Sequence, residues 1–214
     1  MARDRLKIWE TLFQRALALI DSVAAAGAPP LEWSFGGGTV LMRRYRHRLS
    51  KDVDIFISDP QYFGYLSPRL NATAESLTDD YVEQANFLKL LFPEGEIDFV
   101  ASGPLTQNPT VAETLFGREV QVETSTEIIA KKVWHRGAEF KARDIFDFAL
   151  VAEKEPQALD EIRPVLRDRR TILLGRLQAA DGLLRKDFAE LEVLEYRRTY
   201  DECVGILRRA LDNE

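Results

Sequence analysis

The sequence predicts an α+β fold, with a mixed β-sheet flanked by helices in the first half of the chain and a helical bundle in the second. Short apolar runs bounded by turn residues occur up to about residue 123, which is typical of strands. After residue 124, apolar residues instead recur every three or four positions, as on one face of a helix. We therefore expect an α/β core with an N-terminal helix over residues 1–123, and a helical half over residues 124–214 that completes a cleft.

The first predicted element is a helix over residues 4–26. Its apolar residues recur with helical spacing: Ile8, Leu12, Ala16, Leu19 and Val23. Gly27 and two prolines end this helix, and a short strand over residues 31–35 follows. Three glycines then indicate a tight turn, and a helix is predicted from Thr39 to about Tyr45.

Four further strands are predicted before residue 124. Residues 52–57 form the second strand, and the mixed segment 61–74 is expected to contain a helix whose ends the sequence does not define. Residues 81–92 and 96–101 flank a Pro-Glu-Gly turn, so we expect them to pair as antiparallel strands. A loop rich in Pro, Thr and Asn then leads to a strand over residues 119–122.

The second half is predicted to be helical throughout. Ser125 or Thr126 is a candidate N-cap for its first helix, and residues 141–152 form another helix with an apolar face. Pro164 and Gly182 are expected to interrupt the bundle. The last helix carries an apolar and aromatic stripe: Val193, Tyr196, Tyr200, Val204, Leu207 and Leu211.

Net charge, cysteine content and hydropathy argue against several classes of protein. The 214-residue chain has a net charge of −6, which argues against a broad nucleic-acid-binding surface but leaves room for a local basic patch. Cys203 is the only cysteine, so the chain contains neither an intramolecular disulfide nor a multi-cysteine zinc site. No apolar segment approaches the length of a membrane span, and no secretory core follows the charged N-terminus. We therefore expect a cytoplasmic protein without membrane contact.

The stretch from the glycine turn to the second strand carries the most chemistry. Side chains on a strand alternate between its faces, so Asp52 and Asp54 point one way while Val53 and Ile55 point into the core. Two carboxylates on one face suit a hard divalent cation. The glycine turn and the helix start after it can bind phosphate through backbone amides. Asp98, on a later strand, is a third acidic candidate.

This combination resembles the DNA polymerase β-type nucleotidyltransferase superfamily. In that superfamily a Gly-Gly or Gly-Ser turn precedes Asp-x-Asp, and a third acid lies on a neighbouring strand. The resemblance implies a nucleotidyltransferase fold in which Mg²⁺ ions clamp the attacking and leaving oxygens of an NTP. The implied metal ligands, which are also catalytic residues, are the three carboxylates Asp52, Asp54 and Asp98.

Two longer motifs narrow the resemblance to one family. The segments 130–137 and 141–147 are similar to the Lys…Arg…Arg-Asp-x-x-Asp signature of the AbiEii/AbiGii toxin nucleotidyltransferases, relatives of the MenT toxins. The segment 47–54, His-Arg-Leu-Ser-Lys-Asp-Val-Asp, also matches the motif of that family around its Asp-x-Asp. Together the motifs touch most of residues 31–152.

The family resemblance implies roles for the glycine turn and for the helical half. The implied phosphate-binding residues of the turn are Gly37, Gly38 and Thr39. Lys132 stands four positions before Arg136 on one helix face, and this cationic pair is expected to neutralise the phosphates of the nucleotide. Asp144 is implied to matter for catalysis together with Lys132.

Simpler interpretations compete for the neighbouring residues. Asp147 either belongs to the site or pairs with Arg143 or caps a helix. His47 and His135 lack metal-ligand spacing, so a structural or substrate-proximal role is favoured for both. Two arginine clusters could guide a nucleic-acid backbone, but solvated helix faces are the favoured interpretation: Arg43, Arg44, Arg46 and Arg48, and Arg163, Arg167, Arg169 and Arg170.

The favoured function is Mg²⁺-dependent transfer of an NMP from an NTP to an acceptor hydroxyl, with release of pyrophosphate. By resemblance, the acceptor is RNA, with the 3′ end of tRNA as the expected site, and the protein is the toxin of a toxin–antitoxin or phage-defence pair with a cognate antitoxin. One alternative is transfer to a small molecule or a protein hydroxyl. Another is a catalytically silent nucleotide-binding module, in which loss of Asp52, Asp54 or Lys132 would be expected, but all three are present.

Overall fold

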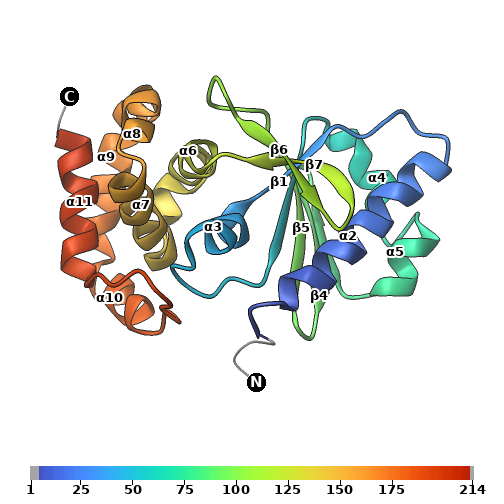
Figure 1. Ribbon diagram of the computed structural model, residues 1–214, viewed down its shortest axis with the longest axis horizontal. Coiled ribbons are helices and arrows are strands. Elements are labelled where there is room, and N and C mark those ends of the chain that lie inside the picture. The colour runs from blue at the N-terminus through green and yellow to red at the C-terminus, as the bar shows by residue number, and fades with distance from the viewer. Residues whose placement is uncertain (1–4, 213–214) are drawn as a thin grey trace. The chain divides into compact units, whose positions relative to one another are not determined.

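The computed structural model describes residues 5–212, which form two compact units (Figure 1). The first unit contains residues up to 40, residues 50–103 and residues 110–123. The second contains residues 41–49, 104–109 and those from 124 onward. The short segments 41–49 and 104–109 lie in the first half of the sequence but belong to the helical unit.

The first unit is built on a seven-stranded mixed sheet with the strand order β3-β4-β5-β2-β1-β7-β6. The strands in chain order are β1 (Trp33–Gly36), β2 (Val53–Ile57), β3 (Tyr81–Gln84), β4 (Phe87–Phe92), β5 (Gly95–Ala101), β6 (Thr110–Leu115) and β7 (Arg118–Glu123). The pairs β2–β5 and β1–β7 are parallel, and all other neighbours are antiparallel. The predicted mixed sheet with flanking helices is confirmed.

One face of this sheet is covered by helix α2 (Ile8–Ala25). The rings of Trp9 and Phe13 lie 5.9 Å and 4.5 Å from the ring of Phe35 on β1. Phe35 is the register partner of Ile55, which in turn is the register partner of Phe99, so all three point to the face under α2. Three short helices complete the first unit: η1 (Pro60–Tyr62), α4 (Phe63–Leu66) and α5 (Ala72–Leu77).

The second unit is helical. Its elements are α6 (Ser125–Arg136), η2 (Gly137–Glu139), α7 (Ala142–Lys154), α8 (Gln157–Glu161), α9 (Arg163–Ala179), α10 (Asp181–Ala189) and α11 (Tyr200–Asp212), together with the last turns of α3 (Gly37–Tyr45). Helix α7 is the centre of the bundle, because it packs against α6, α8, α10 and α11. Its buried apolar residues, from Ile145 to Val151, supply the core of this unit.

Several predicted boundaries in the sheet are corrected by the structure. The run 81–92 is a hairpin of two strands, β3 and β4, because the chain turns between Gln84 and Phe87. Strand β6 was not predicted, because its residues alternate only weakly and most are exposed or half-buried. The predicted helix start at Asp4 lies outside the described residues, within which α2 begins at Ile8.

The helical half also differs from the sequence prediction in detail. Thr124, rather than Ser125 or Thr126, caps α6, since its hydroxyl accepts a hydrogen bond from the amide of Glu127. Pro164 and Gly182 lie in the first turns of α9 and α10, so they mark helix starts. No helix in the described part of the chain is both long and apolar enough to span a bilayer.

Candidate active site

The glycine turn between β1 and α3 places backbone directly against a carboxylate. Gly37 has φ of +74°, a conformation that favours glycine, and it begins α3. A Cβ atom built on Gly37 would overlap Oδ2 of Asp54. Asp54 is the register partner of Gly36 across the β1–β2 pair. The Asp54 carboxylate therefore lies over the turn, and position 37 has room only for glycine.

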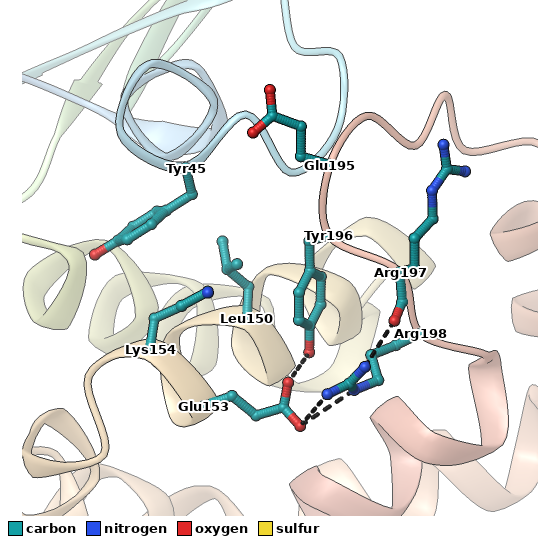
Figure 2. A pocket seen from close by; sticks show the side chains of 8 residues that line it. All are labelled: Tyr45, Leu150, Glu153, Lys154, Glu195, Tyr196, Arg197 and Arg198. Carbon is teal, nitrogen blue, oxygen red and sulfur yellow. Dashed lines mark hydrogen bonds and ion pairs between the residues drawn. The ribbon is translucent and has the colours of Figure 1, made fainter.

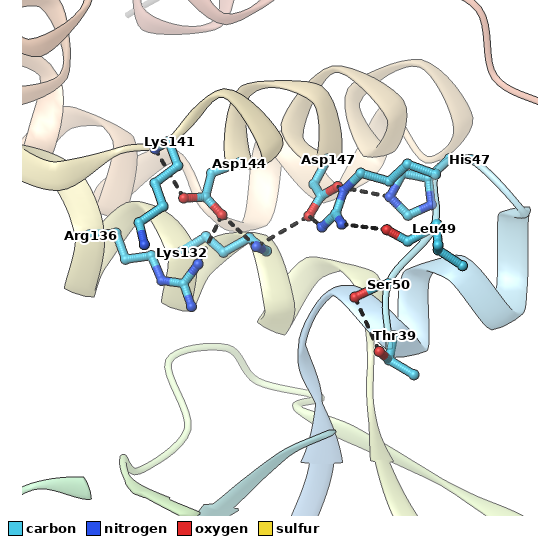
Figure 3. A network of polar contacts seen from close by, with 10 residues as sticks. Thr39, His47, Leu49, Ser50, Lys132, Arg136, Lys141, Asp144 and Asp147 are labelled. Atoms are coloured by element: carbon cyan, nitrogen blue, oxygen red, sulfur yellow. Dashed lines mark hydrogen bonds and ion pairs between the residues drawn. The ribbon is translucent and has the colours of Figure 1, made fainter. Parts of the chain in front are cut away.

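Thr39 ties the start of α3 to the segment that carries Asp52. Its buried hydroxyl donates to the backbone oxygen of Asp52 at 2.5 Å. The same hydroxyl lies 3.1 Å from the hydroxyl of Ser50 (Figure 3). In this conformation the hydroxyl supports the chain before β2. Its predicted contact with phosphate stays a prediction.

The three predicted carboxylates occupy two kinds of position. Asp54 on β2 and Asp98 on β5 are register partners in a parallel pair, so both point to the face opposite Ile55 and Phe99. Asp52 precedes β2, and its Oδ1 atom accepts a hydrogen bond of 3.2 Å from the amide of Glu96. The structure therefore brings Asp54 and Asp98 together, while Asp52 binds the backbone at the start of β5.

Asp98 has an ion-pair partner that the sequence did not reveal. Lys89 lies across the β4–β5 pair from Asp98, and its Nζ atom is 3.1 Å from Oδ2 of that carboxylate. Lys89 also binds Glu96. Burial and the charge of Asp54 together raise the pKa of Asp98 to about 6, although Lys89 opposes both effects.

The donor set fits a divalent cation at Asp54 and Asp98. Oδ1 of Asp98 is buried and accepts no hydrogen bond from the described residues, although Lys89 lies 3.0 Å away. A cation between the two carboxylates would offset the repulsion that the charge of Asp54 exerts on ionised Asp98. Within residues 5–212, however, no group of three or more His, Cys, Asp or Glu side chains is arranged to hold a metal. Asp52 is therefore not grouped with Asp54 and Asp98 as a third ligand in this conformation.

A second polar cluster lies in the helical unit, around the first turns of α7. Asp144 is fully buried and accepts a hydrogen bond of 2.5 Å from Lys132 and one of 3.1 Å from Arg136 (Figure 3). Its second oxygen accepts a 3.1 Å bond from the amide of Lys141, which closes the N-terminus of the helix. Asp144 therefore joins α6 to α7 through two cations.

Asp147, one turn further along α7, has four charged or polar contacts. Arg48 donates from Nε and Nη2 to its two oxygens, both at 2.7 Å, in a bidentate pair. His47 Nε2 lies 2.7 Å from Oδ1, and Lys132 Nζ lies 3.1 Å from Oδ2. Lys132 thus bridges Asp144 and Asp147.

The cations of this cluster stabilise the ionised forms of its two buried carboxylates. Burial raises the pKa of Asp144, but Lys132 and Arg136 outweigh it, so that pKa lies below its usual value. Burial also raises the pKa of Asp147, but the charges of Arg48 and Lys132 lower it by more. The pKa of Asp147 therefore lies well below its usual value. The cluster is therefore an ionised, buried network.

The predicted site residues of the helical half lie inside this network. Lys132 is only 7% exposed, whereas the Arg136 side chain is 34% exposed and has the larger accessible part. Their predicted role in neutralising nucleotide phosphates stays a prediction. The structure assigns both of them a bond to Asp144.

Sequence reasoning missed the contribution of the segment before Asp52. Arg48 was expected on a solvated helix face, and this prediction is wrong, because it is 4% exposed and paired with Asp147. Helix α3 ends at Tyr45, and Arg46 adopts φ of +49°, so the chain leaves the helix before Arg48. His47 is completely buried, in line with the structural role that was favoured for it. The family motif around the Asp-x-Asp includes His47 and Arg48, and it was the sequence feature that could have indicated their importance.

Comparisons with known proteins agree with this fold. A family model described as "Nucleotidyl transferase AbiEii toxin, Type IV TA system" matches residues 19–211. JHP933 from Helicobacter pylori has a similar structure, with a TM-score of 0.51 and 14% identity over 95% of this chain and 90% of its own. The search of curated proteins gave no match.

Two further solved structures are similar. MenT4, a nucleotidyltransferase toxin from Mycobacterium tuberculosis, has a TM-score of 0.51 and 14% identity over 95% of this chain and 84% of its own. The antibiotic-resistance factor ANT(2″)-Ia has a TM-score of 0.55 and 17% identity over 84% of this chain and 100% of its own. At these identities the likeness establishes the fold alone.

Proposed function

The chain belongs to the AbiEii nucleotidyltransferase toxin family, as its motifs indicated, and we propose that it transfers an NMP from an NTP to a hydroxyl group of RNA. The acceptor oxygen would form a bond to the α-phosphorus while the bond from that phosphorus to the β-phosphate oxygen breaks. Pyrophosphate would leave, and the hydroxyl proton would pass to a base. The placement of Asp54, over the Gly37 turn and beside Asp98, is the observation that carries this proposal.

The carboxylates are proposed to act as metal ligands and base. Mg²⁺ held by Asp54 and Asp98, with Asp52 as the third ligand, would neutralise charge that develops on the transferred phosphoryl group. Asp98 is also the candidate base for the acceptor hydroxyl.

The nucleotide is proposed to bind through backbone amides and cations. Gly37 and Gly38 open α3, and the free amides of a helix start bind phosphate without a side chain in the way. Thr39 is the proposed side-chain contact in the same turn. Lys132 and Arg136 are the proposed phosphate-binding cations, and Asp144 is the residue that orients them.

The proposed biological role rests on membership of the family. A toxin of this family would act in the cytoplasm on RNA, with the 3′ end of tRNA as the proposed acceptor, and would be held in check by a cognate antitoxin in a toxin–antitoxin or phage-defence system. Transfer to a small molecule or to a protein is the alternative acceptor class. A catalytically silent nucleotide-binding module is the second alternative.

The test is a transfer assay with each of the four α-³²P-labelled NTPs, Mg²⁺ and total RNA. We expect one NTP to label RNA in an RNase-sensitive band, and Asp54→Ala to abolish the label. Label that survives RNase would indicate a small-molecule or protein acceptor. Nucleotide binding by calorimetry without turnover would support the silent module. Equal labelling by the wild-type protein and Asp54→Ala would contradict the proposed site.

A further inference from the structure

A cavity of about 790 Å³ opens in the helical unit, lined by side chains that the proposed chemistry does not use. Figure 2 shows its lining, which comes from the end of α3, the last turn of α7 and the segment before α11. The lining includes the side chains of Tyr45, Leu150, Lys154, Tyr196 and Arg197. A volume of several hundred Å³ is in the range of sites that hold organic ligands.

The walls of this cavity are held together by backbone hydrogen bonds. The amide of Leu194 donates to the oxygen of His47 at 2.9 Å, and the amide of Glu195 donates to the oxygen of Arg46 at 2.8 Å. The amide of Leu49 donates in the other direction, to the oxygen of Glu192 at 2.8 Å. The segment before α11 is therefore paired with the segment after α3, and the cavity is preformed.

Two carboxylates at the cavity are already neutralised. Glu153 accepts a hydrogen bond of 2.9 Å from the Tyr196 hydroxyl and bonds of 3.2 Å from Arg198. Glu195 is paired with Arg46 at 2.5 Å. Because Arg46 and Arg198 are used in these pairs, the remaining positive charge of the lining comes from other residues.

The cation excess consists of Lys154 and Arg197. Across the described residues, neither the Lys154 ammonium nor the Arg197 guanidinium has an ion-pair or side-chain hydrogen-bond partner. Both are exposed at the cavity. An anion is therefore the ligand that this lining favours.

The aromatic part of the lining favours an anion that carries rings. The Tyr45 hydroxyl donates to Glu155 and lies 3.2 Å from the Ser125 hydroxyl, so it is engaged outside the cavity. Figure 2 shows this hydroxyl turned away from the other lining side chains, while the half-buried ring borders the cavity. A tyrosine ring of this kind can stack on a base of a single strand.

The spacing of the two cations favours a strand over a compact anion. Figure 2 shows the Lys154 ammonium and the Arg197 guanidinium on different sides of the lining, an arrangement that suits successive phosphates of one RNA strand. We propose that this cavity binds a single-stranded segment of the acceptor RNA, with phosphates at Lys154 and Arg197 and a base on Tyr45. This inference rests on the proposed function for the identity of the acceptor.

Helix α7 links this cavity to the buried network. Asp147, Leu150 and Lys154 follow one another at spacings of three and four residues, so they lie along one face of the helix. Seven residues of helix correspond to roughly 10 Å. An RNA strand bound at Lys154 would therefore contact the same rigid helix that carries Asp147.

The test compares two double variants of the full chain that change the net charge equally. Lys154→Gln/Arg197→Gln removes the cavity cations, and Lys186→Gln/Arg208→Gln removes two exposed cations of α10 and α11. Binding of a fluorescein-labelled single-stranded oligoribonucleotide is measured by anisotropy without NTP, at several salt concentrations. Loss of the cavity cations is expected to weaken binding roughly ten-fold and to reduce the slope of log affinity against log salt by about 1.4, which is about 0.7 for each lost phosphate contact. The control should bind within about two-fold of the wild type.

Kinetics and competition give independent readouts. In the transfer assay, the cavity variant should raise the KM for RNA while kcat and the KM for NTP stay unchanged. Equal RNA affinity in the two double variants would overturn the inference, as would competition by poly-glutamate or a mononucleotide as effective as that by RNA. The binding measurement needs no turnover, so a protein that binds RNA here but labels only a small molecule would overturn the proposed acceptor and leave the cavity assignment standing.

Discussion

Asp54 and Asp98 are register partners on the parallel strands β2 and β5, so two carboxylates stand side by side on one face of the sheet. Their neighbours Ile55 and Phe99 fill the opposite face and are completely buried. Because the strands are packed on that side, the two carboxylates cannot move apart easily. This rigidity is what a site for phosphoryl transfer requires of its acidic ligands.

Gly37→Ala is predicted to damage activity far more than its backbone cost explains. The positive φ alone costs about 1–2 kcal/mol for a residue with a Cβ. The new Cβ would also overlap Asp54, and a displacement of about 1 Å at a reacting group can reduce the rate roughly 100-fold. The measurement is kcat/KM for NTP-dependent transfer, together with the free energy of unfolding from urea denaturation.

Gly27→Ala is the matched control for this prediction. Gly27 has φ of +77°, and a Cβ there would meet nothing within 4 Å. It should therefore lose similar stability and keep its activity. If both variants lose activity equally, strain in the backbone accounts for the effect and the contact with Asp54 does not.

Asp98→Asn is predicted to raise the Mg²⁺ concentration needed for half-maximal transfer. Removal of one of two adjacent carboxylates should weaken the cation site at least ~10-fold, the effect seen when supporting groups of metal sites are lost. Chelation with EDTA should abolish transfer in the wild type, and added Mg²⁺ should restore it. Asp79→Asn, on an exposed loop residue of the same unit, should leave the Mg²⁺ titration unchanged. An unchanged titration in Asp98→Asn would remove Asp98 from the metal site.

Local features of this site could be predicted from sequence because they depend on neighbours in the chain. The glycine turn, and the placement of Asp54 on the face opposite Val53 and Ile55, follow from backbone freedom and strand alternation. The pairing of Asp54 with Asp98 does not, since register between strands separated by 44 residues depends on the whole sheet. Lys89 was missed for the same reason, because it meets Asp98 only across a strand pair.

In the helical unit, too, contacts between residues that are distant in sequence could not be predicted from the sequence. Arg48 and Asp147 are 99 residues apart in sequence and form a bidentate ion pair. A run of arginines gives no indication of which one will be buried, because that depends on where α3 ends. The family signature marked both residues without showing that they bind each other. Helical periodicity predicted α7 well, because its buried face is set by local spacing.

Asp147→Asn is predicted to destabilise the protein by about 3–5 kcal/mol, because it leaves Arg48 and Lys132 buried with one carboxylate fewer. The control is Asp212→Asn, which breaks an exposed pair with Arg170 and should cost under about 1 kcal/mol. Urea denaturation followed by circular dichroism measures both. A loss under about 1 kcal/mol at Asp147 would show that this network contributes little to folding.

His47 is predicted to make the stability of the protein fall as pH decreases below about 6.5. Burial lowers the pKa of His47 from 6.5, and Arg48 and Lys132 lower it further, while the hydrogen bond to Asp147 opposes them without reversing the shift. Below 6.5 the unfolded chain therefore binds a proton that folded His47 does not, and the free energy of unfolding decreases. Asp98 acts in the opposite direction, since its pKa is raised, so the wild-type curve alone is ambiguous. The difference in unfolding free energy between wild type and His47→Gln, measured from pH 7.5 to 5.5, isolates His47: it should shift in favour of the variant as pH falls, and a constant difference would contradict the prediction.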